Sequence, residues 1–441
     1  MIFFRKIFRI LDFFTSIFIA LLAILALGIR RSFGKIKLKN PRNSLLSITK
    51  DGMYRILDCN DENYLRWSFT RPNIEKTYIL YIGTEKQKIF KFGKQVIGIN
   101  VTMPFEKIKP YLPFTIRIAQ QIFGFLITLR ILKNLRPKVI EVMFPSKLSL
   151  RAMLLKWILP IKLVTQVRGN LDLIYYFNRF PCFFPFKMNF FVLEVFQVMW
   201  DKLISLLFYR SCDLVIGYNI NNMLSAISNG AHPKKTKLSR IKIALGMLRV
   251  QKKNRSEIKE LPQSGNIISL WSRLSPEKLV LESIQAFEKL SDSIREEYYL
   301  VIVGDGPERL KILSYLETSR CKNHVYILGQ RERSFIAQIA LHSSLSIVPY
   351  GGSSLVEALM LGVPVVAFDI EWHNELIRDG ETGYLADFPD TDHLAGKMLA
   401  SLSNKEKSEQ MAHSAQKLAT KMFDTKTIDD KEARYYQTLL E

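Results

Sequence analysis

The second half of the chain alternates short apolar runs with helical patterns, and this alternation limits the fold more than any other feature. Such an order is typical of a parallel sheet whose strands are joined by crossover helices. A doubly wound, Rossmann-like domain of this kind binds its ligand beyond the carboxyl ends of the strands. The predicted strands are 267–271, 299–303, 325–328, 345–348 and 364–368, and the predicted helices are 277–290, 308–316, 332–342 and 354–361.

The first half shows a similar but looser alternation. Its β-branched apolar runs indicate buried strands, whereas residues 40–71 are polar and fit no clear element. The predicted strands are 78–83, 96–101, 139–144, 162–167 and 213–218, and the predicted helices are 110–138 and 149–159.

A chain of 441 residues is too long for a single ordinary core and suits two α/β domains. The polar, charged segment 251–265 is the predicted linker between them. The stretch 405–441 should form one or two surface helices. The predicted order is an anchor with a basic flank at 1–42, a Rossmann-like domain at 43–250, the linker, and a second Rossmann-like domain with terminal helices at 266–441.

Charge is distributed unevenly between the halves. Residues 1–250 carry 40 Lys and Arg against 13 Asp and Glu, a net of +27, and residues 251–441 carry 23 against 28, a net of −5. A basic half favours contact with nucleic acid or with an anionic membrane surface. Because the sequence has neither paired Cys/His ligands nor aromatic RNA-binding motifs, we predict anionic membrane lipid as a partner and no nucleic acid.

The uncharged segment 13–29 is the strongest membrane signal. Its 17 residues reach the lower limit for a helix that spans a bilayer. Dense positive charge after the segment would keep the following residues in the cytoplasm. We predict an anchor at the cytoplasmic face of the plasma (inner) membrane that either spans the bilayer or lies on it; a cleaved signal peptide and a buried helix are the alternatives.

A second apolar stretch, Phe180 to Phe208, has few charges. It fits either a pair of core helices or an apolar face that enters the membrane or holds a lipid tail.

Cysteine and histidine usage argues against a structural metal. The cysteines show no C-x-x-C pair, which is typical of a reduced cytosolic protein. The histidines likewise lack ligand spacing. The four cysteines are Cys59, Cys182, Cys212 and Cys321.

Two loops that follow predicted strands carry candidate ligand-binding residues. In WSRLSPEK at 271–278, Arg273 ends a strand and Lys278 begins a helix, so both cations can meet a diphosphate; solvated surface cations are the alternative. In VGDGPE at 303–308, Gly304 and Gly306 allow a tight turn and close approach to a ligand. A plain turn is the alternative there.

A third loop, PYGGSSLVEA at 349–358, leads from a strand into a helix N-terminus. Successive backbone N–H groups and the helix dipole bind anions at such a point without any side chain. Glu357 lies about one turn inside the helix, where it can accept hydrogen bonds from ribose hydroxyls. The loop residues assigned to the ligand are Gly351, Gly352, Ser353, Ser354 and Leu355.

Together these blocks resemble the retaining GT-B glycosyltransferases of family 4. The resemblance covers roughly residues 265–390 and is carried by SLWSRLSPEKLVLESIQAF, LVIVGDGPE, VYILGQ and IVPYGGSSLVEALMLGVPVVAFDIEWHNELIRDGETGYL, in that order. It implies two Rossmann-like domains facing a cleft, with the nucleotide sugar on the second and no metal or cofactor. Arg273 and Lys278 would hold the donor diphosphate and Glu357 the ribose, and these three form the predicted catalytic set.

The sequence departs from this family at three places, one of which is Ser272, where the family has glycine before the Arg of the first block. Many members carry a further Glu eight residues before the position of Glu357, in contact with the transferred sugar, and here that residue is Pro349. The sugar would then be held by loop amides or by acids such as Asp369 or Glu371. Leu279 stands where glycine is common.

The first half matches the family more loosely. The segment VTQVRGN at 164–170 resembles the strand and loop that border the active cleft on the acceptor side. No histidine lies between residues 43 and 230, so we assign no histidine base. Enzymes of this type are thought to use the leaving phosphate as the acceptor of the proton. The acceptor-side candidates are Arg168, Gly169, Asn170 and Asp172.

Asp390-Thr391-Asp392 formally matches the D-x-D metal signature of the other large glycosyltransferase fold. It stands where a helix begins, so we interpret it as a helix N-cap.

These observations predict a glycosyltransferase that moves a sugar from a nucleotide-diphosphate sugar to a membrane-associated acceptor, such as a lipid-linked glycan, a glycolipid or lipopolysaccharide. The alternative is a catalytically inactive homologue that binds nucleotide sugars or partner enzymes at the membrane. Donor, acceptor and linkage stay open at this point.

Overall fold

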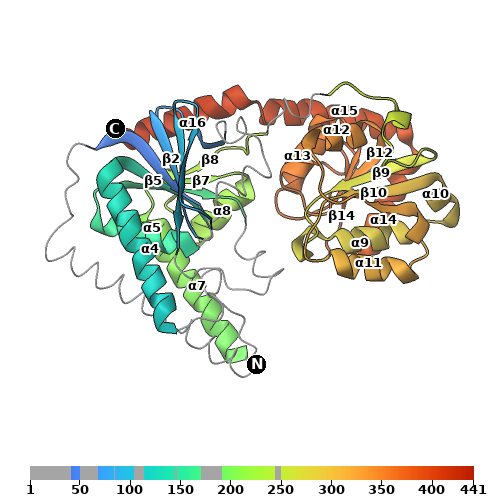
Figure 1. The fold of residues 1–441 in the computed structure, drawn as a ribbon. Coiled ribbons are helices and arrows are strands. Elements are labelled where there is room, and N and C mark those ends of the chain that lie inside the picture. The colour runs from blue at the N-terminus through green and yellow to red at the C-terminus, as the bar shows by residue number, and fades with distance from the viewer. Residues whose placement is uncertain are drawn as a thin grey trace. The chain divides into compact units, whose positions relative to one another are not determined.

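The computed structural model describes residues 41–49, 68–83, 85–103, 114–144, 147–169, 191–243 and 250–441. The chain divides into two compact units (Figure 1). Unit 1 comprises Met1–Arg240 together with Lys426–Glu441, and unit 2 comprises Ile241–Thr425. The predicted anchor at 13–29 lies outside the described residues, and so do residues 180–190 of the apolar stretch that begins at Phe180. The rest of that stretch belongs to helix α7, Phe191–Ser211.

The described part of unit 1 is built on an eight-stranded sheet in the order β3-β4-β2-β1-β5-β6-β7-β8. All neighbouring strands are parallel except β3 and β4, which form an antiparallel pair at one edge. The five strands predicted in this half are confirmed, and β1, β3 and β8 are additional. The strands are β1 Arg42–Ile48, β2 Lys76–Gly83, β3 Lys88–Phe92, β4 Val96–Thr102, β5 Pro137–Phe144, β6 Lys162–Val167, β7 Leu214–Gly217 and β8 Thr236–Leu238.

Helices cover both faces of this sheet. One face packs on α4, α5 and α7 through a cluster that includes Leu80, Leu132 and Phe208. The other face packs on the last helix of the chain, α16, through Val139 and Tyr436. The helices are α4 Phe114–Leu135, α5 Lys147–Ile158, α7 Phe191–Ser211, α8 Ile220–Ser228 and α16 Thr425–Leu440.

A buried polar cluster fixes α16 to the sheet. Glu141 in β5 accepts two hydrogen bonds from the guanidinium of Arg71, at 2.9 and 3.0 Å, and one from the hydroxyl of Tyr436 at 2.6 Å. Burial alone would raise the pKa of Glu141, but the charge of Arg71 and these bonds lower it. Since an unpaired charge inside a protein is strongly unfavourable, the three groups hold one another in place.

The observed units differ from the predicted domains at both ends of unit 2. Helix α16 packs on unit 1, whereas the sequence analysis placed 405–441 entirely in the second domain. The predicted linker 251–265 lies against unit 2, where Ile258 and Leu261 are buried. The side chain of Gln338 bonds to the backbone of Lys253 and Gln251, at 3.0 and 2.7 Å.

Unit 2 is built on a six-stranded, fully parallel sheet in the order β11-β10-β9-β12-β13-β14. Because the order turns back at β9, the strands on either side of it are reached by crossovers in opposite directions, which is the doubly wound arrangement. The five predicted strands are confirmed, and β14 is additional. The strands are β9 Asn266–Trp271, β10 Tyr298–Val303, β11 Val325–Ile327, β12 Ser343–Ile347, β13 Val365–Phe368 and β14 Tyr384–Ala386.

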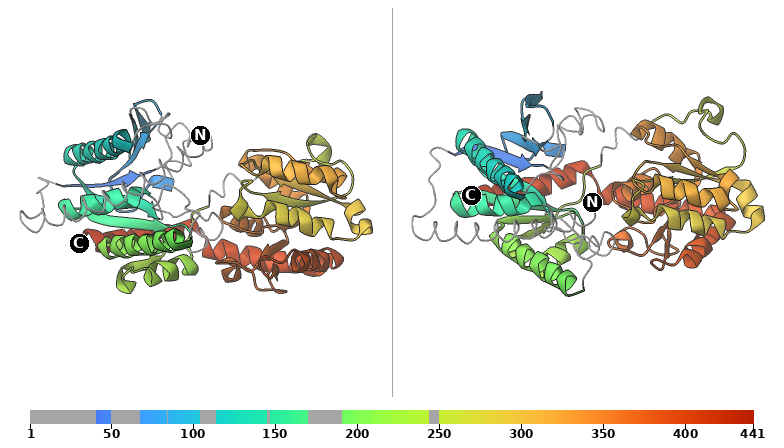
Figure 2. Two further views of the ribbon diagram at one scale, coloured as in Figure 1. Left: turned by 90° about the horizontal axis from the view of Figure 1, so that it is seen from below. Right: turned by 60° about the horizontal axis from the view of Figure 1, so that its bottom comes forward.

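The helices of unit 2 form a layer on each face of its sheet, as the two views of Figure 2 show together with Figure 1. Helices α12, α13 and α15 share one apolar cluster with the sheet. Helix α14 contacts α9 and the strands β12, β13 and β14 on the other face. The helices are α9 Val280–Glu288, α10 Asp292–Glu297, α11 Arg309–Thr318, α12 Arg333–Leu341, α13 Ser353–Met360, α14 Thr391–Ser403 and α15 Lys405–Met422.

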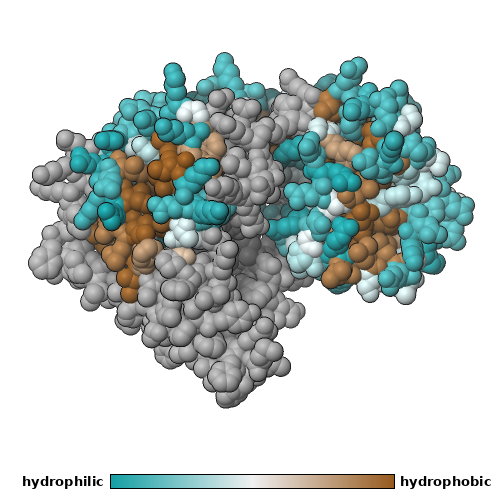
Figure 3. Space-filling view, in the orientation of Figure 1, coloured by the Kyte–Doolittle hydropathy of each residue, from teal (hydrophilic) through white to brown (hydrophobic). Residues whose placement is uncertain are grey.

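Unit 1 exposes apolar side chains on several described helices, among them α4 and α7. Helix α4 exposes Leu126 to 54%, and helix α7 exposes Met199 to 65% and Leu203 to 46%. Figure 3 shows hydrophobic surface over the region of α4. No helix within the described residues is both long and apolar enough to cross a bilayer.

Candidate functional site

The loops that carry the predicted ligand-binding residues of unit 2 leave the sheet at the same edge. Strands β9, β10, β12 and β13 are parallel, so their carboxyl ends meet there. The side chains that these loops present come from residues far apart in the sequence.

Gly304 and Gly306 join the loop after β10 to the loop after β9. A Cβ atom on Gly304 would lie 1.7 Å from the carbonyl oxygen of Ser272, and one on Gly306 would lie 2.3 Å from that of Leu274. Gly304 also has φ of +147°, a conformation that side chains disfavour. The structure therefore gives both glycines a role in packing the two loops, and through that contact they position the loop that carries Arg273.

Arg273 lies on the surface with 66% of its side chain exposed. Its Nε atom donates to the hydroxyl of Ser275 at 3.0 Å, and the same guanidinium forms an ion pair with Glu277. Burial raises the pKa of Glu277, but hydrogen bonds from Ser275, from its own backbone and from Arg273 lower it by more than burial raises it. The net shift of the pKa is therefore downward. An exposed pair of this kind stabilises the fold by only about 0–1 kcal/mol, so a phosphate can replace Glu277 as the partner of Arg273.

Lys278 reaches the loop after β12. Its ammonium donates to the carbonyl oxygen of Tyr350 at 3.1 Å and lies 4.8 Å from the centre of the Tyr350 ring. Burial is the main cause of the lowered pKa of Lys278. Leu279, which follows it, has φ of +51°. Glycine adopts this left-handed conformation readily, which explains why glycine is common at this position in the family that the sequence resembles. The same conformation disfavours leucine by about 1–2 kcal/mol.

The N-terminus of α13 follows the glycine loop. Its first backbone N–H groups, from Ser353, Ser354 and Leu355, have no carbonyl partner within the helix. A Cβ on Gly351 would lie 2.6 Å from the Cβ of Leu355, so this position requires glycine, whereas a Cβ on Gly352 would meet nothing within 4 Å. These amides and the helix dipole form a site suited to an anion.

His373 supports this loop from behind. It is 1% exposed; the Gly351 N–H donates to its Nε2 at 2.9 Å, and its Nδ1 lies 2.7 Å from the carbonyl oxygen of Phe368. The neutral ring with its hydrogen on Nδ1 satisfies both partners. Burial lowers the pKa of His373 to about 4, which keeps the ring in this neutral form. The sequence analysis did not identify His373.

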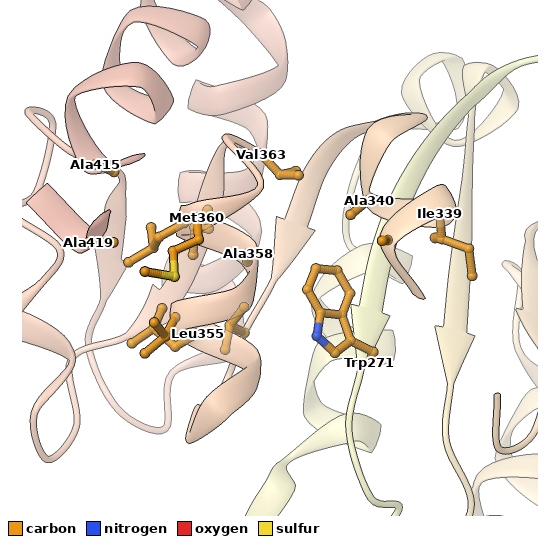
Figure 4. Packing of buried hydrophobic residues seen from close by; sticks show 14 of the residues in the cluster. Trp271, Ile339, Ala340, Leu355, Ala358, Met360, Val363, Ala415 and Ala419 are labelled. Atoms are coloured by element: carbon orange, nitrogen blue, oxygen red, sulfur yellow. The ribbon is translucent and has the colours of Figure 1, made fainter. Parts of the chain in front are cut away.

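Glu357 is 4% exposed and is held by two residues that the sequence analysis also missed. Trp271, the last residue of β9, donates its indole N–H to one carboxylate oxygen at 3.1 Å, and Arg333 at the start of α12 forms an ion pair with the other. Figure 4 shows the Trp271 side chain among the buried residues of α12 and α13. A carboxylate has about four acceptor positions, so Glu357 keeps capacity for ribose hydroxyls.

The two acids considered for the missing sugar contact differ in setting. Asp369 is exposed and accepts a hydrogen bond from the side chain of Asn374 at 3.3 Å. Glu371 is half-buried, and the hydroxyl of Tyr350 is hydrogen-bonded to it.

The acceptor-side candidates belong to unit 1. Arg168 follows β6, is exposed, donates to Gln166 at 2.7 Å and lies 5.0 Å from the centre of the Tyr218 ring. Gly169 follows it directly. Asn170 and Asp172 lie outside the described residues, so all four stay predictions.

The D-x-D-like segment is a helix cap. The carboxylate of Asp390 accepts hydrogen bonds from the backbone N–H groups of Asp392 and His393, at 2.8 and 3.0 Å, at the start of α14. The predicted N-cap is thus confirmed. In the described ranges, no three His, Cys, Asp or Glu side chains gather in a way that could hold a metal ion.

Comparison with known proteins finds similarity in the C-terminal part of the chain. Residues 251–418 match the family model described as "Glycosyl transferases group 1". The chain is 29% identical over 182 residues, 41% of its length and 47% of the relative's, to N-acetyl-alpha-D-glucosaminyl L-malate synthase of Bacillus anthracis. It is 30% identical over 149 residues, 33% of its length and 39% of the relative's, to phosphatidyl-myo-inositol mannosyltransferase of Mycobacterium leprae. The chain thus aligns with less than half of each of these two relatives.

The fold extends beyond the family match. The crystal structure of Anabaena HepE in complex with UDP and glucose has a TM-score of 0.64 at 18% identity and covers 90% of this chain and 99% of that one. At this identity the likeness concerns the fold alone. Both units are the Rossmann-like domains of a GT-B glycosyltransferase fold, as the sequence analysis predicted.

Proposed function

We propose that the whole chain, of which residues 251–418 match the glycosyl transferases group 1 family model, transfers a sugar from a nucleotide-diphosphate sugar to a membrane-associated acceptor, with retention of configuration and without a metal ion. The acceptor would be a lipid-linked glycan, a glycolipid or lipopolysaccharide. The similarity to a phosphatidyl-myo-inositol mannosyltransferase supports transfer of a sugar to a lipid acceptor.

The observation that carries the proposal is the meeting of two cations and a free helix N-terminus at one edge of the sheet in unit 2. Lys278 contacts the loop that opens α13, and Arg273 leaves the neighbouring strand β9 on an exposed side chain. A diphosphate would bind the amides of Ser353, Ser354 and Leu355. It would also displace Glu277 as the ion-pair partner of Arg273. Glu357, oriented by Trp271 and Arg333, would accept from the ribose hydroxyls.

Charge stabilisation is the main chemical contribution that this site can make. When the bond between the sugar and the phosphate breaks, negative charge grows on the leaving diphosphate. The side chains of Arg273 and Lys278 and the oriented α13 amides would stabilise this growing charge. They would therefore stabilise the transition state more than the ground state, which lowers the barrier. The leaving phosphate would accept the proton of the acceptor hydroxyl, so no protein base is assigned.

The membrane part of the proposal rests on the first half of the chain. The basic charge of residues 1–250 and the apolar segment 13–29 support binding to an anionic surface. The exposed apolar side chains of α4 and α7 would add to it. The protein would then act at the cytoplasmic face of the plasma membrane.

The test is release of nucleoside diphosphate from a panel of UDP-, GDP- and ADP-sugars by the full chain, with and without a lipid extract that contains acceptors. We expect release from one donor, faster with lipid. Arg273→Ala should lower kcat/KM by about 100-fold, since removal of one group that stabilises transition-state charge typically has an effect of this size.

Arg378→Ala is the matched control, because Arg378 is also exposed and paired with a Glu in the next turn, at 3.8 Å. It should leave kcat/KM unchanged. An equal loss in both variants would contradict the diphosphate site. Tight donor binding without turnover under any lipid would favour the inactive homologue, and failure to sediment with anionic vesicles would remove the membrane part alone.

A further inference from the structure

The proposed donor site has groups for a diphosphate and a ribose. Pro349 stands where the family that the sequence resembles often has the Glu that contacts the transferred sugar. We propose that Glu371, together with Tyr350, forms the subsite that binds the hydroxyl groups of that sugar. This inference rests on the proposed function and adds its sugar-recognition residues.

The backbone at Glu371 is unusual in a way that a structural role alone does not require. Its φ of +51° lies in the left-handed region, which glycine adopts readily and glutamate does not. The chain around it is well anchored: Ile370 and Trp372 are buried, and the backbone N–H of Asp369 bonds to Ala386 at 2.8 Å. A strained residue in a rigid surrounding is typical of a functional position.

Tyr350 connects Glu371 to the diphosphate site. Its hydroxyl is hydrogen-bonded to Glu371, and its pKa is raised by burial first and then by the charge of that carboxylate. The carbonyl oxygen and the ring of the same Tyr350 contact the ammonium of Lys278, at 3.1 Å and 4.8 Å. The Glu371 carboxylate therefore lies one residue away from a cation assigned to the phosphates, which is where a sugar attached to the diphosphate would begin.

The sign of the charge identifies the ligand group. A carboxylate beside a bound diphosphate is repelled by it, so Glu371 does not serve the phosphates. Hydroxyl groups, in contrast, donate short and strong hydrogen bonds to a carboxylate. The carboxylate of Glu371 and the hydroxyl oxygen of Tyr350, whose hydrogen is donated to Glu371, together offer acceptors, which suits the donor hydroxyls of a polyhydroxyl ring.

The rival explanation is that Glu371 only holds Tyr350 and Lys278 in place. The two explanations differ in the binding of nucleoside diphosphate without sugar. A positioning role would weaken UDP, GDP or ADP binding as much as nucleotide-sugar binding. A sugar subsite affects only the difference between the two affinities.

The experiment measures Kd by calorimetry for each nucleoside diphosphate and its hexose derivative with the wild-type full chain, Glu371→Gln, Glu371→Gly and Asp369→Asn. Glycine fits the left-handed backbone, so Glu371→Gly should keep the fold. We expect both Glu371 variants to raise the Kd for the nucleotide sugar by about tenfold or more, since loss of a hydrogen bond to a charged group typically weakens binding by about this factor. In these two variants the Kd for the nucleoside diphosphate should change less than about twofold. Asp369→Asn should change neither the Kd for the diphosphate nor that for the nucleotide sugar.

Equal weakening of diphosphate and nucleotide sugar would overturn the subsite in favour of the positioning role. A selective effect of Asp369→Asn, with none at Glu371, would move the subsite to the other acid. If no nucleoside diphosphate binds the wild type, the proposed function is overturned and the subsite with it. If the wild type binds a nucleoside diphosphate and its hexose derivative with equal Kd, the subsite alone is overturned.

Discussion

Replacement of His373 by Gln should remove a pH-dependent part of the stability of unit 2. The neutral ring accepts from the Gly351 N–H and donates to the Phe368 carbonyl oxygen. A protonated ring would turn a second N–H toward the Gly351 N–H, and that donor would have no acceptor. The fold therefore binds this histidine in one protonation state only.

The size of the effect follows from the pKa. Burial lowers the pKa of His373 to about 4, from an ordinary value near 6.5. Between these values the unfolded chain binds more protons than the folded chain, so the free energy of unfolding rises with pH across this window. The contribution is fully present above pH 6.5 and is lost as the pH falls to about 4, by roughly 3 kcal/mol at most.

The measurement is urea unfolding of the full chain between pH 4.5 and 7.5, compared between wild type and His373→Gln. We expect the slope of stability against pH to be smaller in the variant, which cannot titrate at this position. His413, which is exposed on α15, provides the control variant His413→Gln with the wild-type slope. The reasoning is refuted if His373→Gln keeps the wild-type slope, or if His413→Gln is the variant that loses it.

Two further predictions concern packing. Gly304→Ala should destabilise unit 2 by about 3 kcal/mol or more, because the new Cβ would lie 1.7 Å from the carbonyl oxygen of Ser272; Gly396→Ala, in open space on α14, should stabilise it by about 1 kcal/mol, and equal melting temperatures of the two variants would contradict this. Arg71→Met should lower the free energy of unfolding of unit 1 by about 3–5 kcal/mol by leaving the buried carboxylate of Glu141 without its cation. Much of that loss should return in Arg71→Met/Glu141→Gln, and a double variant as unstable as the single one would contradict the reasoning.

Strands with a pronounced apolar run were predictable from the sequence, whereas strands such as β1 and β14 were missed. Strand β10 was predicted to within one residue of its observed bounds, Tyr298–Val303, because its apolar run is unbroken. Strand β1 was missed although it lies in the middle of the sheet, because the buried serines Ser44 and Ser47 interrupt its apolar run. Strand β14 has only three residues, which is too short for any periodic pattern.

The destination of the last helix could not be predicted for a different reason. Helix α16 has a clear apolar side, and the sequence analysis predicted helices in this stretch. Which domain that side covers depends on contacts such as Tyr436 with Glu141, which are 295 residues apart. A single sequence contains no signal for such a pairing.

The same distinction applies to the site. Arg273, Lys278 and Glu357 could be named from motifs within short segments, and the structure brings their loops to one edge of the sheet. Trp271 and Arg333 could not, since they act on Glu357 across separations of 86 and 24 residues. The left-handed backbone of Glu371 is likewise a property of the folded loop.

The pairing of charges in unit 2 argues for a ligand that carries both phosphate and hydroxyl groups. Arg273 is paired with Glu277 and Arg333 with Glu357, and the charge of Glu371 raises the pKa of Lys278 against the effect of burial. A simple anion would compete with each of these carboxylates and gain little. The diphosphate of a nucleotide sugar would pair with Arg273 and Lys278, and its ribose and sugar would offer hydroxyl donors to Glu357 and Glu371. The arrangement therefore favours the whole donor molecule over any of its anionic fragments, which is the selectivity that a transferase needs when nucleoside diphosphate is its product.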